Sequence, residues 1–176
     1  MTTDRIDAAD LLPGLGRMST KVDGLDFVAR RVFDAPRDQV FRAFTDCRYL
    51  SQWWGPAGWT LPVCEMDFRP GGTWFYGMKS PEGQLSHGAM RYEEIVEPER
   101  IAGTDLFVDG EGRPVPDMPE TSIVFTFSEQ GGKTTLSSRS TFATAKDVET
   151  VLGMGMVEGL TQTWDRLEAL LAAPPA

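Results

Sequence analysis

Apolar and polar side chains alternate along many short segments of this chain. Alternation with a period of two is typical of strands that bury one face, and it first occurs in LDFVARRVF. Further strands are predicted within 59–106 and 121–142, where the same alternation recurs. The glycine pairs Gly71-Gly72 and Gly131-Gly132 indicate hairpin turns between neighbouring strands. Most of the chain is therefore predicted to form antiparallel strands.

Helical spacing of apolar residues occurs in three places. PRDQVFRAFTD follows Asp34, which can cap a helix, and a second short helix ends at Gly55-Pro56. One long helix is predicted over 145–171. Its apolar face contains Leu152, Met156, Leu160, Thr163, Leu167 and Leu170. A strand, two short helices, a run of antiparallel strands and a long final helix predict an α+β fold.

The pattern indicates a single domain over residues 25–172. Residues 1–24 show no sustained period and contain several glycines, so we interpret them as a flexible N-terminal extension with at most one short helix over 8–12. Residues 173–176 are expected to form a short tail. The length of 176 residues agrees with one domain, for which about 150 is typical.

Composition and charge exclude several classes of partner. The chain is 41% hydrophobic and 24% charged, as in ordinary globular domains, and its net charge of -9 corresponds to a pI near 4.6. An acidic surface repels phosphate backbones, so no nucleic acid partner is expected. No apolar run approaches the ~18 residues that a membrane span needs. A homodimer is left open.

Two features indicate a reduced, cytoplasmic protein. The N-terminus has no basic segment followed by an apolar one, as a signal peptide would. Cys47 and Cys64 form no CxxC motif and belong to no larger even-numbered set of cysteines. The two cysteines are therefore expected to be unlinked.

The sequence lacks the motifs of common catalytic sites. His87 is the single histidine, which excludes His-rich metal sites, and no GxSxG nucleophile motif occurs. Gly132-Lys133-Thr134 resembles the end of a phosphate-binding loop, but Phe127 stands where its first glycine is required. We expect no metal and no cofactor.

A concentration of aromatic residues is the strongest chemical signal. Trp74, Tyr76 and Met78 share one face of a predicted strand, whereas Phe75 points to the opposite face. The long final helix is the element that can cover such a face. Its glycines (Gly153, Gly155 and Gly159) have two interpretations: they allow close packing on the sheet, or they leave space for a ligand.

Four segments carry a resemblance to a known family. They are FVARRVFDAPRDQVFRAFTDCRYLSQWWGP, MDFRPGGTWFYGM, EEIVEPERI and GMGMVEGLTQTWDRLEALL. Over residues 25–172 the chain resembles the AHSA1-like family (Hsp90 ATPase activator homologues) of the START-like or Bet v 1-like (SRPBCC) superfamily. The resemblance implies a helix-grip fold, in which six or seven antiparallel strands curl around the C-terminal helix. It also implies a cavity that commonly holds a hydrophobic ligand.

The first functional hypothesis is therefore the binding of a small hydrophobic or aromatic molecule, without an established reaction. Such pockets have apolar walls and a few placed polar groups. The candidate wall residues are Trp74, Tyr76, Met78, Met90, Phe107, Met154 and Met156, and the candidate polar contacts are His87, Arg91 and Tyr92. Each of these residues has ordinary core or surface packing as its alternative.

Two other functions remain as alternatives. An enzyme of the polyketide cyclase or aromatase type would need a general acid or base in the cavity, and His87, Glu65, Asp67 and Tyr76 are the available side chains. A protein-interaction module would use an exposed rim around Trp53-Trp54. A chaperone partner is not expected, because only about two dozen residues precede the first predicted strand.

Overall fold

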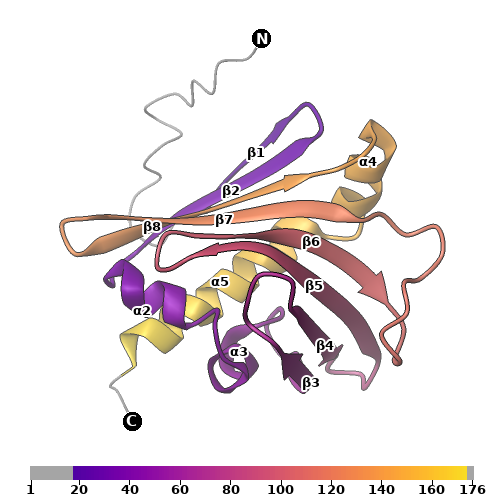
Figure 1. Ribbon diagram of the computed structural model, residues 1–176, viewed down its shortest axis with the longest axis horizontal. Helices are drawn as coiled ribbons and strands as arrows, with labels where there is room; N and C mark the ends of the chain where they lie inside the picture. Colours follow the sequence, from indigo (N-terminus) through magenta and orange to yellow (C-terminus); the bar gives the residue numbers. More distant parts are fainter. Residues whose placement is uncertain (1–17, 174–176) are drawn as a thin grey trace.

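The computed structural model describes residues 18–173, in which eight antiparallel strands form one curved sheet. The strand order is β1-β2-β8-β7-β6-β5-β4-β3. The strands are β1 Ser19–Asp23, β2 Asp26–Phe33, β3 Thr60–Met66, β4 Thr73–Lys79, β5 Leu85–Val96, β6 Arg100–Val108, β7 Thr121–Gln130 and β8 Lys133–Thr141. The helices are α2 Arg37–Arg42, α3 Cys47–Trp53, α4 Ala145–Gly153 and α5 Met156–Ala172. Figure 1 shows α5 crossing one face of the sheet, so the predicted α+β helix-grip architecture is confirmed.

The sheet has one strand more than the six or seven predicted. The additional strand is β1, which pairs with β2 through a tight turn at Gly24, where φ is +62°. The prediction placed these residues in the flexible extension, because STKVD carries few apolar side chains and no clear alternation. The short helix predicted over 8–12 lies outside the described residues, as does most of the C-terminal tail.

The predicted long C-terminal helix is divided into α4 and α5. The division falls at Met154-Gly155, where Gly155 adopts the left-handed φ of +84° and precedes the first turn of α5. A Cβ atom at Gly153 or Gly155 would meet no neighbour within 4 Å. These two glycines therefore serve neither close packing nor a cavity. They break the helix, because glycine has a low helix propensity and tolerates positive φ.

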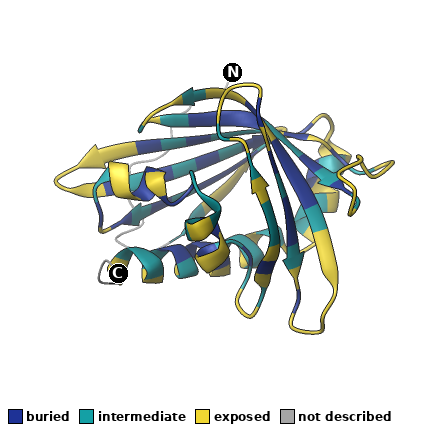
Figure 2. Ribbon diagram, turned by 60° about the horizontal axis from the view of Figure 1, so that its bottom comes forward, coloured by how far each residue is buried: buried dark blue, intermediate teal, exposed yellow. Residues whose placement is uncertain are grey.

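The predicted apolar face of the final helix packs on the sheet. Leu167 is completely buried and Thr163 nearly so, while Leu152, Met156 and Leu160 pack against the core from partly buried positions. Trp164, which the prediction did not include, is also completely buried, and its ring lies edge-on to Phe33, 6.1 Å away. Figure 2 shows buried segments running through the strands and recurring along α5.

Two ion pairs of Arg31 join β2 to α5 at the edge of this interface. Arg31 is only 2% exposed, and its Nη1 lies 2.7 Å from a carboxylate oxygen of Asp165. Glu168, one turn further along α5, lies 3.4 Å from Nη2. Because a buried cation is costly without an anionic partner, these two ion pairs favour one register of the helix on the sheet.

Candidate functional site

A cavity opens between the concave face of the sheet and the segment that follows α3. The cavity and the open solvent at its mouth together occupy about 410 Å³. Aromatic and aliphatic side chains form nearly all of its surface, and Asp105 is the one carboxyl group among the described residues that line it. The lining residues are Phe44, Trp54, Trp74, Met90, Tyr92, Ile101, Asp105, Ile123 and Phe125.

The wall on the sheet side follows from strand register. Trp74 on β4 pairs with Met90 on β5, and Met90 pairs with Asp105 on β6. Directly paired residues point to the same face of a sheet, so these three side chains form one row across three strands. Tyr92 lies two residues beyond Met90 on the same side of β5, and it too lines the cavity. The alternation of each strand thus brings residues distant in sequence into one wall.

Trp54, the C-cap residue of α3, forms the wall on the α3 side, where its ring packs on the sheet wall. Its ring lies 4.8 Å from that of Trp74 and 5.8 Å from that of Tyr76, in both cases edge to face. Arg166 of α5 fixes the backbone at this point, because its Nη1 donates to the carbonyl oxygens of Gly55 at 2.9 Å and Trp59 at 3.2 Å, among others. Arg166 therefore positions the Trp54 wall without itself lining the cavity.

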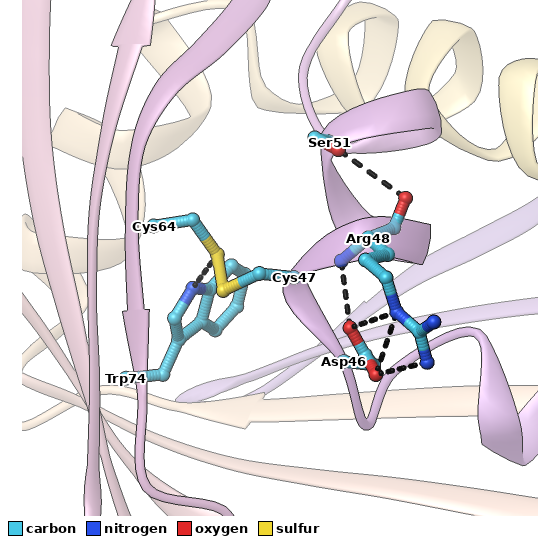
Figure 3. Close-up of a disulfide and its surroundings, with 6 residues drawn as sticks. All are labelled: Asp46, Cys47, Arg48, Ser51, Cys64 and Trp74. Atoms are coloured by element: carbon cyan, nitrogen blue, oxygen red, sulfur yellow. Dashed lines mark hydrogen bonds and ion pairs between the residues drawn. A yellow bond between two sulfur atoms is a disulfide. The ribbon is translucent and has the colours of Figure 1, made fainter.

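A disulfide between Cys47 and Cys64 supports the Trp74 wall. It joins α3 to β3, with a Cα–Cα distance of 5.9 Å, and the indole Nε1 of Trp74 donates to Sγ of Cys64 at 3.3 Å (Figure 3). The prediction of two unlinked cysteines is wrong. The residues are 17 apart in sequence and meet only because α3 folds back on the sheet, which their spacing does not reveal.

Reduction of this disulfide is expected to lower the free energy of unfolding by about 3 kcal/mol, because the bond removes loop entropy from the unfolded chain. Urea unfolding with and without a phosphine reductant measures the difference. The double variant Cys47→Ala/Cys64→Ala is the control, since the reductant should not affect it. An unchanged urea midpoint for the wild-type protein after complete reduction would contradict the structural role of the bond.

Asp105 is a partly buried carboxyl group in apolar surroundings. Burial raises its pKa to about 7, although hydrogen bonds from the Tyr76 hydroxyl and the Leu106 amide act in the opposite direction. Burial and the nearby Asp105 charge raise the pKa of Tyr76 well above its ordinary value, so this phenol stays a neutral donor. Gly88 provides the room for it, because a Cβ atom there would overlap the Tyr76 ring.

The raised pKa of Asp105 gives the stability a defined pH dependence. An Asp carboxyl in the unfolded chain titrates near pH ~3.9, so between about pH 4 and pH 7 the unfolded chain loses a proton that the folded protein keeps. The free energy of unfolding therefore falls as pH rises through this window. Asp105→Asn is expected to raise the melting temperature at about pH 8 and to change it little at about pH 4.

Thermal melts of the wild-type and Asp105→Asn proteins across this pH range measure the effect. Asp117→Asn is the matched control, because Asp117 is exposed in the loop after β6. A constant difference in melting temperature between the wild type and Asp105→Asn at all pH values would show that Asp105 ionises normally in the folded protein.

The cavity contains three of the sequence-predicted site residues: Trp74, Met90 and Tyr92. Tyr76 lies on the same face of β4 and reaches the cavity through its hydrogen bond to Asp105. Met78 continues that face, where it packs against the core outside the cavity lining.

The other predicted site residues lie elsewhere. His87 stacks on Phe75, with 5.8 Å between ring centroids, on the opposite face of the sheet. Arg91 is exposed and pairs with Glu120 at 3.4 Å. Met154 is 58% exposed at the break between α4 and α5, whereas Met156 packs against the core and Phe107 is partly buried, and none of the three lines the cavity. Alternation along β5 turns His87 and Arg91 to the opposite face of the sheet, and the helix break leaves Met154 exposed. Phe107 shares the face of Asp105 but lies two residues further along β6, outside the lining.

The surface proposed for a protein-interaction module is not exposed. Trp53 is completely buried and donates its Nε1 hydrogen to the Ala43 carbonyl oxygen at 3.0 Å. Trp54 is partly buried and lines the cavity. Glu65 and Asp67, two of the predicted acid–base candidates, are exposed and absent from the lining.

The sequence did contain a signal for Asp105. In the segment RIAGTDLF, alternation places Asp105 on the same face as Ile101, so a carboxyl group interrupts an otherwise apolar row. Phe44, Ile123 and Phe125 carried no comparable signal, because aromatic and β-branched residues are ordinary in any core.

Comparisons with known proteins agree with the fold and the resemblance. The family described as Activator of Hsp90 ATPase homolog 1-like protein matches residues 34–172. No curated protein matches the chain. Among residues 18–173, no helix has the length and apolar character required to cross a membrane.

Solved structures of bacterial proteins are similar along most of the chain. The crystal structure of protein Ms6760 from Mycobacterium smegmatis is 31% identical, with a TM-score of 0.82 over 91% of this chain and 98% of that one. A solution structure from Staphylococcus epidermidis is also 31% identical, with a TM-score of 0.75 over 88% and 93% of the two chains. The AHSA1 protein from Silicibacter pomeroyi is 27% identical, with a TM-score of 0.67 over 84% and 97%.

Proposed function

Because the chain belongs to the family of Activator of Hsp90 ATPase homolog 1-like proteins, whose helix-grip fold is a ligand-binding one, we propose that it binds a small aromatic or otherwise hydrophobic molecule. The observation that carries this proposal is the aromatic cavity with Asp105 as its one carboxyl group among the described lining residues. Trp74, Met90 and Tyr92 are proposed to contact the ligand.

The chemistry of the walls supports a flat, apolar ligand. Small-molecule pockets are lined mainly by hydrophobic and aromatic side chains, with a few polar groups that orient the ligand. Trp54 and Trp74 lie edge to face, with 4.8 Å between ring centroids, and together present one continuous indole surface to a ligand. Apolar surface that the ligand and the cavity remove from water favours the binding free energy by about 25 cal/mol per Å².

A cavity-filling variant tests the proposal. Ile123 on β7 lines the cavity, and the neighbouring Val124 points to the opposite face of the same strand. Ile123→Phe should reduce the affinity for a bound aromatic compound, whereas Val124→Phe should retain it. Native mass spectrometry of the purified wild type first looks for a retained molecule. Isothermal titration then measures the affinity of both variants for the aromatic compound. Equal affinities of the two variants would contradict binding in this cavity.

A second candidate function is acid–base catalysis of the polyketide cyclase or aromatase type. A carboxyl group with a pKa of about 7 beside a neutral phenol is suited to proton transfer near neutral pH. Under this alternative, Asp105→Asn would abolish turnover of an added polyketide while the variant still bound it. Equal turnover by the wild type and the variant would exclude catalysis by Asp105.

A further inference from the structure

The cavity combines a carboxyl group with several aromatic rings around it. Asp105 projects from the centre of the sheet, and the rings of Phe44, Trp54, Trp74 and Phe125 line the same space. Aromatic rings carry negative potential on their faces and attract cations, and attraction strengthens when water is excluded. Rings arranged around an anion are therefore suited to an organic cation.

We propose that the cavity selects organic amines: a small ring-bearing molecule whose protonated amino group pairs with Asp105 while its ring packs against Trp54 and Trp74. This inference rests on the proposed function, because it identifies the chemical class of the ligand in the same cavity.

The charges around Asp105 favour a cation over a neutral ligand. No Lys, Arg or His is found among the described residues that line the cavity. The carboxyl group accepts hydrogen bonds from the Tyr76 hydroxyl and the Leu106 amide, which are both neutral donors, so within residues 18–173 the lining offers its ionised form no positive partner. A desolvated carboxylate is stabilised most strongly by a charged donor. The net charge of -9 also raises the local concentration of cations around the protein.

The pairing gives amine binding a defined pH dependence. Among the described residues, the other titratable groups at the cavity are Tyr76 from β4, which bonds to Asp105, and Tyr92 from β5, which lines the same space. Burial raises the pKa of both phenols, so both are neutral. An alkyl amine remains protonated to about pH 9, as lysine does. The ion pair therefore needs only the loss of the Asp105 proton, and affinity for the amine should rise between about pH 5 and pH 8.

Benzylamine and benzyl alcohol are a matched pair of probes, because they have nearly the same shape and differ in charge. Isothermal titration of the wild type at about pH 8 is expected to show at least a tenfold preference for the amine, the factor that corresponds to about 1.4 kcal/mol. At about pH 5 the preference should decrease strongly. Asp105→Asn should remove the preference for the amine at both pH values, whereas Asp117→Asn should behave as the wild type.

The outcomes separate this inference from the proposed function. If the wild type binds both compounds with equal affinity, or if Asp105→Asn retains the preference, the amine selection is wrong while ligand binding in the cavity stands. If the wild type binds neither compound at millimolar concentration, the amine selection is also wrong. If Ile123→Phe and Val124→Phe bound every aromatic compound tested with the same affinity, the proposed function would be wrong as well.

Discussion

Replacing Leu167 with Asp is expected to prevent stable folding. The Leu167 side chain is completely buried between α5 and the sheet, and an unpaired carboxylate at this position would be removed from water without a partner. The cost is several kcal/mol, a large part of the ~5–15 kcal/mol that normally separates folded from unfolded chains. Circular dichroism during thermal and urea unfolding measures the loss.

Val157→Asp is the matched control for this variant. Val157 lies on the same helix but is 38% exposed, so the same substitution should change the free energy of unfolding by less than ~1 kcal/mol. If Leu167→Asp melted at the wild-type temperature, the packing of α5 on the concave face would be wrong.

Trp74→Ala is expected to lower the free energy of unfolding by about 3–5 kcal/mol and to change which ligands the protein prefers. The Trp74 ring lines the cavity, packs against Trp54 and Tyr76, and donates a hydrogen bond to Cys64. Its removal enlarges the cavity and leaves one wall without support. A bound ligand at a hundredfold excess over its Kd stabilises the folded state by about 2.7 kcal/mol, which a thermal shift detects.

Phe75→Ala is the control on the neighbouring residue. Phe75 points to the opposite face of β4 and packs with Ala89, Leu106 and Val108, so its loss should lower stability without a change in ligand preference. A thermal-shift screen of fatty acids, sterols and aromatic compounds on the three proteins provides the comparison. Identical ligand profiles for the wild type and Trp74→Ala would exclude the cavity assignment.

Local patterns of the sequence predicted most of the fold. The alternation of β4 correctly separates Trp74 and Tyr76 from Phe75, because strand geometry alone decides which face a side chain occupies. The apolar face of the final helix was also predictable, since a period of 3.6 residues defines it. The break at Gly155 was not, because the apolar spacing continues across it while the backbone does not.

The cavity depends on long-range pairing, which a local pattern cannot supply. Asp105 becomes a cavity residue only because β6 pairs with β5 beside Met90. Arg166 donates hydrogen bonds to backbone carbonyl oxygens over 100 residues earlier in the chain. Its local sequence does not distinguish it from an arginine that is exposed on the surface. The disulfide likewise requires α3 to fold back on β3. Each of these features is decided by tertiary contacts.

Methyl nuclear magnetic resonance provides the most direct test of ligand binding in the cavity. With labelled Met and Ile methyl groups, the wild-type protein is titrated with the compound that stabilises it most in the thermal-shift screen. The signals of Met90, Ile101 and Ile123, which line the cavity, should shift together and saturate at one ligand per chain, while exposed Met154 stays unchanged. A saturable shift at Met154 with no change at the three cavity methyl groups would contradict the account.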